Sequence, residues 1–385
     1  MTTIIDQFRT IHCPSRKGIA ALAAQSPRLG DLAQSHPVLF VALATGYGDP
    51  VRRAAAIEAA LAGRRLRTVC DLAAIPYCLR SVPRDLCPVP LPHADWSSDA
   101  SPVLAQFIPD DPLTLCNWVP AIFFANGAAG EAFAMWLAIR HELFTREFRS
   151  TRQLLPIALY AWFAQHPEHE LHGLLPARWS ARGGSRRLLN ATRAWLYRIG
   201  CRIYLPGSDA QEHQAVPFTI GPFLAIELSD YRALLAEQQA MDNCLDRYGR
   251  RIASGSHAVF SLRTQTGEPV ANFEVAIHAP NGPLISEIRG RSNVDLAPEI
   301  IQPVLRWVAA SSDFLRRRAV AEGGHGREAD DIFAELIAPY VTTHQEALAS
   351  FGPVTLQSLE SDLSELAKRV GMTNWPVRYE RTQGV

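Results

Sequence analysis

The sequence predicts an α+β fold: a mostly helical N-terminal part, a small antiparallel β-meander packed by a long helix, and a helical C-terminal tail. Three observations lead to this prediction. With 48% hydrophobic and 20% charged residues, the chain has the composition of an ordinary globular protein. Long stretches toward both ends have helical periodicity. Between them, short alternating segments are separated by turn sequences. We expect three regions, residues 1–205, 206–310 and 311–385.

The N-terminal region is predicted to be helical. Residues 49–75 are rich in Ala, Leu and Arg, which predicts a pair of helices with Asp49 or a neighbour as the cap. The most apolar stretch, residues 117–139, is interrupted by Pro120 and Gly130. Because a membrane-spanning helix needs roughly 20 uninterrupted apolar residues, we expect core helices around a turn there and no membrane segment.

The middle region changes from helices to strands. Residues 223–228 predict a short strand. Ser229 and Asp230 are cap candidates for a long helix that runs through Ile252. Three further strands are expected, joined by the turn sequences QTGEP and PNGP into an antiparallel meander. These strands are residues 257–264, 270–279 and 283–290.

Charge and cysteine content limit the class of protein. The formal net charge is zero, so no overall field favours nucleic acid or a cationic partner. Only two residues are lysine, so basic surfaces consist of arginine side chains, whose planar forks match anions. Seven irregularly spaced cysteines are typical of reduced thiols, and the first residues lack a signal-peptide pattern. We therefore expect a cytoplasmic protein, and no pattern indicates a cofactor or a metal site.

A set of spaced residues in the middle region resembles a known family. A predicted helix ends in Met-x-x-Cys-x-x-x-Tyr, one strand carries Ser-x-Arg, the next has a central Glu, and the last runs into Arg-Gly-x-x-Asn. Over residues 223–310 this is similar to the PcfJ-like domain, a family named from a conjugative plasmid and common in plasmids, phages and bacterial chromosomes. Many members have His before the Cys, where this chain has Asn243. The resemblance implies an architecture and candidate residues, but no reaction. The matching residues are Met241, Cys244, Tyr248, Gly255, Ser261, Arg263, Glu274, Arg289, Gly290 and Asn293.

Cys244 is either a packing residue or a nucleophile. It lies at the edge of an apolar stripe on the predicted helix. A thiol in the middle of a helix lacks the N-terminal amides that lower its pKa, and Asn243 cannot act as a base. Packing is therefore the favoured interpretation. In the alternative, Cys244 is a nucleophile, with Glu274 or Glu287 as the general acid or base.

The predicted strand pairing separates two faces of the sheet. Ser261 is expected opposite Asn272, which in turn lies near Arg289, and Arg263 is expected opposite Val270. Glu274 is expected near Glu287. We expect the apolar face to receive the helix that carries Cys244, and the polar face to be either solvated or a ligand-binding surface. The polar face contains Ser261, Arg263, Asn272, Glu274, Glu287 and Arg289, and the apolar face contains Phe260, Leu262, Phe273, Val275, Ile277, Leu284 and Ile288.

The last strand runs into the sequence RGRSN, in which Arg289, Arg291 and Asn293 are ligand candidates. We expect a positive φ at Gly290. Two guanidinium groups beside exposed amides can hold a phosphate or a carboxylate. The alternative is an ordinary turn capped by Ser292 or Asn293. The remaining ligand-binding candidates are His257 and Tyr248.

Three functions remain open. In the first, the polar sheet face binds a polar or anionic ligand, and the family context implies nucleic acid of a mobile element. In the second, the same face belongs to an enzyme. In the third, the N-terminal helices bind a protein partner. The arginine-rich residues 178–193 fit the first function. The three histidines of HPEHELH are predicted to lie at a polar helix end rather than to bind zinc.

Overall fold

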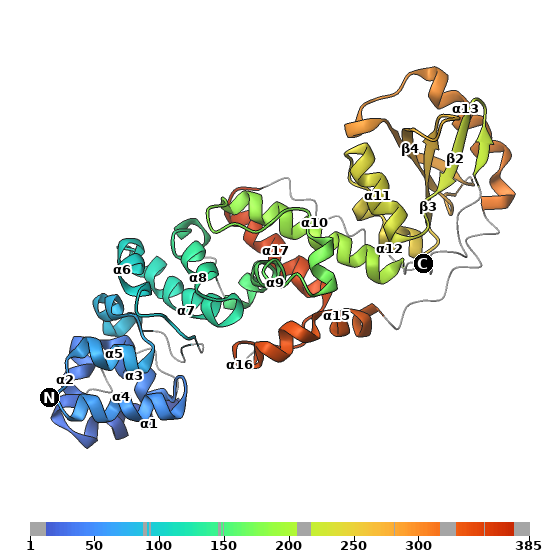
Figure 1. Cartoon of the computed structure of the whole chain (residues 1–385). Coiled ribbons are helices and arrows are strands. Elements are labelled where there is room, and N and C mark those ends of the chain that lie inside the picture. The colour runs from blue at the N-terminus through green and yellow to red at the C-terminus, as the bar shows by residue number, and fades with distance from the viewer. Residues whose placement is uncertain are drawn as a thin grey trace. The chain divides into compact units, whose positions relative to one another are not determined.

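The chain consists of two compact units, which Figure 1 shows coloured along the sequence. The first unit is Met1–Thr192 with Ile337–Val385, and the second is Arg193–Leu336. The predicted α+β class is confirmed, because helices precede and follow a five-stranded antiparallel sheet. This computed structural model describes residues 13–87, 91, 94–144, 148, 150–205, 217–280, 282–315, 329–349 and 351–372.

The described part of the first unit is helical. The predicted helix pair is present as α4 (Pro50–Leu61) and α5 (Leu66–Ala73). Asp49 caps α4, because its carboxylate accepts a hydrogen bond of 2.9 Å from the Arg52 amide. Three helices precede this pair, namely α1 (Cys13–Gln25), α2 (Pro27–Ser35) and α3 (Pro37–Thr45).

The most apolar stretch forms the core of this unit. It folds as α7 (Pro112–Ala129) and α8 (Glu131–Ala138), which meet at Gly130, whose φ is 85°. This confirms the prediction of core helices around a turn. Among the described residues, none of the helices combines the length and the hydropathy that crossing a bilayer would require. Helix α9 (Leu155–Phe163) packs against α7, and α17 (Leu356–Arg369) packs against α9.

Shorter elements complete the described fold of the first unit. They are α6 (Ala100–Leu104), α16 (Gln345–Leu348), η2 (Tyr77–Ser81), η3 (Arg84–Leu86), η4 (Ala105–Phe107), η5 (His141–Leu143), η6 (Thr151–Leu154) and η7 (Glu170–Leu174). Two longer helices contain the boundaries between the units, namely α10 (Ser185–Tyr204) and α15 (Ala329–Thr343).

The second unit contains the sheet, with strand order β1-β2-β3-β4-β5. The predicted pairs of Ser261 with Asn272 and of Glu274 with Glu287 are confirmed. The prediction of Val270 opposite Arg263 was wrong, because the register shifts after Leu262 and Arg263 pairs with Pro269. The short first strand was not predicted. The strands are β1 (Phe218–Ile220), β2 (Phe223–Glu227), β3 (His257–Arg263), β4 (Pro269–Ala276) and β5 (Leu284–Arg289).

A bulge in β5 changes one predicted position. Glu274 pairs with Glu287, but the next residue of β4 pairs with Ile285, so Ser286 is the extra residue of the bulge. The bulge turns Ile285 toward the core and leaves Leu284 45% exposed. The placement of Leu284 on the apolar face was therefore wrong, because regular alternation cannot anticipate a bulge.

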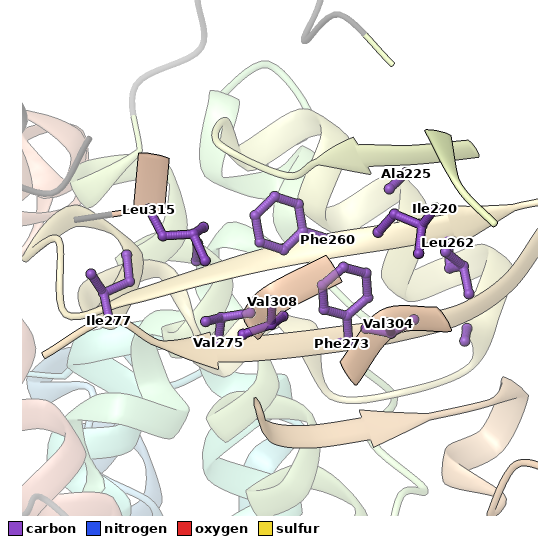
Figure 2. Packing of buried hydrophobic residues seen from close by; sticks show 12 residues of the cluster. Ile220, Ala225, Phe260, Leu262, Phe273, Val275, Ile277, Val304, Val308 and Leu315 are labelled. Atoms are coloured by element: carbon purple, nitrogen blue, oxygen red, sulfur yellow. The ribbon is translucent and has the colours of Figure 1, made fainter. Parts of the chain in front are cut away.

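The apolar face of the sheet packs against α13 (Pro298–Ala310), as Figure 2 shows for Val304 and Val308 beside the strand residues. The rings of Phe260 and Phe273 stack at 4.9 Å between centroids. Trp307 of α13 meets both rings edge-on, at 5.5 and 6.1 Å. The helix that covers this face is thus the one that follows the sheet in the sequence.

The opposite face is also covered. It packs against α11 (Tyr231–Met241) and α12 (Gly249–Ala253), and Val259 joins Leu234 and Ile252 in a second buried cluster. Figure 1 shows α11 and α13 on opposite sides of the strands. The prediction that the segment carrying Cys244 packs on the apolar face was wrong. The sheet lies between two helical layers, and β1 and β5 are its edges.

Candidate functional site

The segment that carries Cys244 is not one continuous helix. Helix α11 ends at Met241, because Asp242 adopts a left-handed conformation with φ 49° and ψ 54°. Aspartate and asparagine tolerate this conformation better than other residues with a side chain. The chain then forms a short turn, η8 (Leu245–Arg247), before α12. The prediction of a single helix through Ile252 was wrong, and the Asp-Asn pair at 242–243 is the signal that it overlooked.

Cys244 precedes η8 and lines a pocket, where it is half-buried. Burial raises the pKa of its thiol, and the carboxylates of Asp246 and Glu287 raise it further, against the opposite effect of Arg247. The thiol is therefore protonated at neutral pH. A nucleophilic cysteine needs the reverse environment, with a lowered pKa, so this environment does not fit covalent catalysis.

The polar face of the sheet is not an open surface. Ser261, Asn272 and Glu274 are all buried, because α11, η8 and α12 cover them. Burying polar side chains is unfavourable unless each finds a hydrogen-bond partner. Glu237 and Arg251, which lie in the covering layer, supply such partners. Neither residue was predicted from the sequence.

Glu237 is the centre of the first polar network. It is 1% exposed. Its carboxylate accepts hydrogen bonds from the Ser261 hydroxyl at 2.7 Å and from the Asn272 amide at 2.9 Å, and it forms an ion pair with the Arg263 guanidinium. Asn243 extends the network by donating to Asn272 at 2.6 Å. Ser261 and Arg263 thus attach the helix layer to the sheet. The prediction that they share a solvated or ligand-binding face was wrong.

The second polar network centres on Glu274. Arg251 donates to Glu274 Oε1 at 3.3 Å, and His257 Nε2 lies 3.6 Å from the same oxygen. Glu287 lies on the neighbouring strand β5, and its Oε2 accepts a hydrogen bond of 2.9 Å from the Tyr248 hydroxyl. Burial and the two carboxylates raise the pKa of Tyr248, so its hydroxyl remains a donor.

Arg289 continues this network to the surface. It donates to Glu287 Oε1 at 3.4 Å and forms an ion pair with Asp295. Its side chain is 40% exposed. Arg289 therefore lies at the boundary between the pocket and solvent, with two carboxylates already beside it.

The turn after β5 is built differently from the prediction. Gly290 has φ −81°, whereas Ser292 and Asn293 take the positive values, 53° and 61°. A larger residue at 290 would be crowded, because a Cβ there would lie 3.0 Å from side-chain atoms of Val294 and Leu296. The turn η9 (Arg291–Asn293) is exposed, and Ser292 donates to the Asp242 carboxylate at 2.9 Å.

Most predicted site residues converge on one pocket. It has a volume of ≈ 30 Å³, enough for about one water-sized group. The residues that line it come from the segment after α11, from the adjacent strands β3, β4 and β5, and from η9. Of the predicted site residues, Cys244, Tyr248, Asn272, Glu274, Glu287, Arg289 and Asn293 line this pocket. His257 contacts Glu274, Arg291 lies on the exposed turn, and Ser261 and Arg263 belong to the Glu237 network.

Other sequence candidates lie apart from this pocket. In HPEHELH, His166 and His169 stack on the Trp162 ring at 3.9 and 5.2 Å between centroids. No group of three His, Cys, Asp or Glu side chains arranged to hold a metal ion occurs among the described residues. The arginine-rich stretch is divided, because Arg193 belongs to the second unit and the preceding arginines to the first.

Comparisons with protein-family models, with curated proteins and with solved structures give no match to this chain. The candidate site therefore rests on its own geometry. That geometry consists of a small pocket at the edge of the sheet, lined by Glu274, Glu287 and Arg289, with Arg291 exposed on η9.

Proposed function

We propose that the chain is a cytoplasmic nucleic-acid-binding protein, and that its second unit binds a single-stranded segment along β5 and η9. The observation that carries this proposal is the convergence of seven predicted residues on one pocket at an open sheet edge. The resemblance to the PcfJ-like domain adds the context of mobile genetic elements. The possible protein partner of the N-terminal helices stays a prediction.

The charges of the site favour a ligand with two kinds of groups. Glu274, Glu287 and Arg289 line the pocket, and both Glu287 and Asp295 balance the charge of Arg289. The interior therefore favours hydrogen-bond donors, such as the amino groups of nucleobases, over anions. Carboxylate side chains accept hydrogen bonds from such amino groups in nucleic-acid complexes. A pocket of this size admits one such group rather than a whole base.

The mouth of the pocket favours phosphate. Arg291 is exposed on η9 and has no ion-pair partner among the described residues. A separate cluster lies on η8 and α10, where Arg193, Arg198 and Arg247 act on the single buried carboxylate of Asp246. Phosphate groups of a strand outside the pocket would meet the exposed guanidinium of Arg291.

An enzyme that uses Cys244 as nucleophile is the less supported alternative. The thiol is protonated, and its nearest acidic neighbours oppose ionisation. Glu274 already contacts Arg251 and His257, which hold its carboxylate in place inside the unit. These contacts support a binding site with fixed acceptors more than a site in which a proton moves.

The proposal is tested by fluorescence anisotropy of a labelled single-stranded oligonucleotide over a range of salt concentrations. We expect binding that weakens as salt rises. For each phosphate contact, log K of binding should fall by about 0.7 per tenfold rise in salt concentration. Arg291→Ala should weaken binding and reduce the salt slope by about one contact. Arg306→Ala is the matched control, because Arg306 is an exposed arginine of α13, the helix on the other face of the sheet.

Two results would contradict the proposal. One is the absence of binding to both DNA and RNA strands at low salt. The other is an equal loss of binding in Arg291→Ala and Arg306→Ala. That result would indicate that the oligonucleotide is attracted to any surface arginine rather than to a site at the β5 edge.

A further inference from the structure

The pocket at the β5 edge contains a hydrogen-bond acceptor that the fold itself does not use. Glu274 lines this pocket and is 5% exposed. Its Oε1 accepts a hydrogen bond of 3.3 Å from Arg251 and lies 3.6 Å from His257 Nε2. Its Oε2 has no partner among the described residues, yet it is not one of the unpartnered atoms that are sealed from solvent. Because protein encloses the rest of this side chain, the accessible part of Oε2 opens onto the pocket.

The neighbouring carboxylate is already occupied. Glu287 Oε2 accepts a hydrogen bond of 2.9 Å from the Tyr248 hydroxyl, and Glu287 Oε1 accepts one of 3.4 Å from Arg289 Nε. Of the two glutamates that line the pocket, Glu274 is therefore the one that can receive a further hydrogen bond. A carboxylate oxygen only accepts, so the group that meets it must be a donor. An amino group fulfils this condition, whereas a carbonyl oxygen would be repelled by the negative charge.

Hydrogen-bond donors lie beside this acceptor, closer to solvent. Arg289 uses its Nε for Glu287 and its Nη1 for Asp295, while its Nη2 has no partner among the described residues. The Arg289 side chain is 40% exposed and lines the pocket. Asn293 also lines the pocket from the exposed turn η9, and its side-chain amide is a second donor. The pocket thus presents an acceptor inside and donors at its mouth.

This order of groups matches some nucleobases and not others. Cytosine carries its N4 amino group beside the acceptor N3, and adenine carries its N6 amino group beside the acceptor N1. Uracil and thymine carry a carbonyl oxygen beside an N3–H, which is the reverse order. Bases of single strands expose these edges to side chains, and carboxylates accept from the cytosine amino group. A volume of ≈ 30 Å³ admits the amino group and leaves the ring at the mouth, where Arg289 lies.

We propose that this pocket selects cytosine and adenine over uracil and thymine in a bound single strand. Glu274 accepts from the amino group, and Arg289 donates to the ring nitrogen beside it. This selectivity rests on the proposed function and adds which bases that site takes. Arg251 and His257 are positioning residues, because they hold Oε1 and thereby fix the direction of Oε2. Arg291 adds affinity for every sequence, since phosphate contacts carry no sequence information.

Fluorescence anisotropy with the full chain tests this selectivity. Two labelled DNA strands of equal length are compared, one of deoxycytidine and one of deoxyuridine, above neutral pH so that cytosine stays unprotonated. The two bases differ only at the edge that the pocket is proposed to read. We expect the deoxycytidine strand to bind about tenfold or more tightly, the discrimination that a good pair of hydrogen bonds to a base provides. The salt slopes should be equal, because the phosphate backbones are identical.

Glu274→Gln tests the assigned acceptor. The glutamine oxygen keeps the hydrogen bond from Arg251, so the NH₂ group takes the place of Oε2 and the pocket presents a donor instead. We expect the variant to bind the deoxyuridine strand at least as tightly as the deoxycytidine strand. Glu268→Gln lies in an exposed turn of the same unit and should keep the wild-type preference. The wild-type comparison decides the proposal even where a variant fails to fold.

The possible failures are distinguishable. Equal affinity of the wild type for the two strands overturns the selectivity and leaves the proposed function standing. A preference that persists unchanged in a folded Glu274→Gln variant also overturns it, because the preference then arises elsewhere. The absence of binding to either strand at low salt overturns both the selectivity and the proposed function.

Discussion

Replacing Glu237 with glutamine tests whether the buried network holds the helix layer on the sheet. The substitution keeps the size of the side chain. The glutamine oxygen can still accept from Ser261 and Asn272, as Glu237 Oε1 does. The other position becomes an NH₂ group that faces the guanidinium of Arg263, so an ion pair is replaced by two donors.

The burial of the two partners sets the expected magnitude. Removing one member of a buried ion pair costs about 3–5 kcal/mol, because the other charge is left without a partner. Glu237 is 1% exposed, whereas the Arg263 side chain is 26% exposed and retains some contact with water. We therefore expect the lower end, about 3 kcal/mol, or roughly a hundredfold change in the opening equilibrium of this unit.

Hydrogen exchange of the full chain, followed by mass spectrometry of peptides from β3 and β4, measures this change in the second unit alone. We expect exchange in Glu237→Gln to be faster by about two orders of magnitude. Glu268→Gln, in an exposed turn of the same unit, is the control. The reasoning is refuted if exchange in Glu237→Gln stays within about threefold of wild type, the size of an ordinary surface effect.

Three further predictions concern single residues. Because burial raises the pKa of Cys244, iodoacetamide should label this thiol more slowly in the folded chain than in urea at neutral pH; equal rates by peptide mass spectrometry would contradict this. Gly249→Ala should destabilise the second unit by about 1–3 kcal/mol in the same exchange assay, because a Cβ at 249 would lie 2.8 Å from Cys201 Cα. Burial lowers the pKa of His36 to about 4, so only the unfolded chain takes up this proton as the pH falls below about 6.5. The first unit should therefore lose about 2 kcal/mol of stability between about pH 7 and pH 5. A thermal or urea titration of His36→Asn should lack this part of the loss.

Strand pairing was predictable because it depends on local sequence. Side chains alternate along a strand with a period of two, so the two turn sequences alone place Ser261 opposite Asn272 and Glu274 opposite Glu287. The same alternation failed at Leu284, where the bulge at Ser286 shifts the register by one residue. A bulge depends on how the strand packs, and no turn residue marks it.

The assignment of helices to sheet faces was not predictable from periodicity. The helices before and after the sheet both have an apolar stripe, and either stripe can pack on an apolar strand face. Val304 and Val308 of α13 occupy that face in the structure. The segment around Cys244 covers the polar face instead because Glu237 satisfies the buried groups there. Such a match between distant residues is visible only in three dimensions.

The pocket was predicted in part. The residues of β4 and β5 that line it follow from strand register. The place of Cys244 beside them depends on the helix break at Asp242, whose left-handed backbone redirects the chain. The Asp-Asn pair allows such a break, but the helical spacing of the apolar residues around it favours a continuous helix.

Because the sheet lies between two helical layers, the second unit has positions where substitutions disturb packing and other positions where they do not. A substitution in the middle of β3 or β4 meets packed side chains on either face, so its main effect is on how much folded protein exists. At the outer edge of β5 and on η9, side chains meet solvent. Changes there can alter what the unit recognises while the folded population is preserved. In a mutational survey, substitutions in this sheet should therefore fall into two classes. Those in β3 and β4 lower the amount of folded protein, and those at the edge of β5 and on η9 change binding alone.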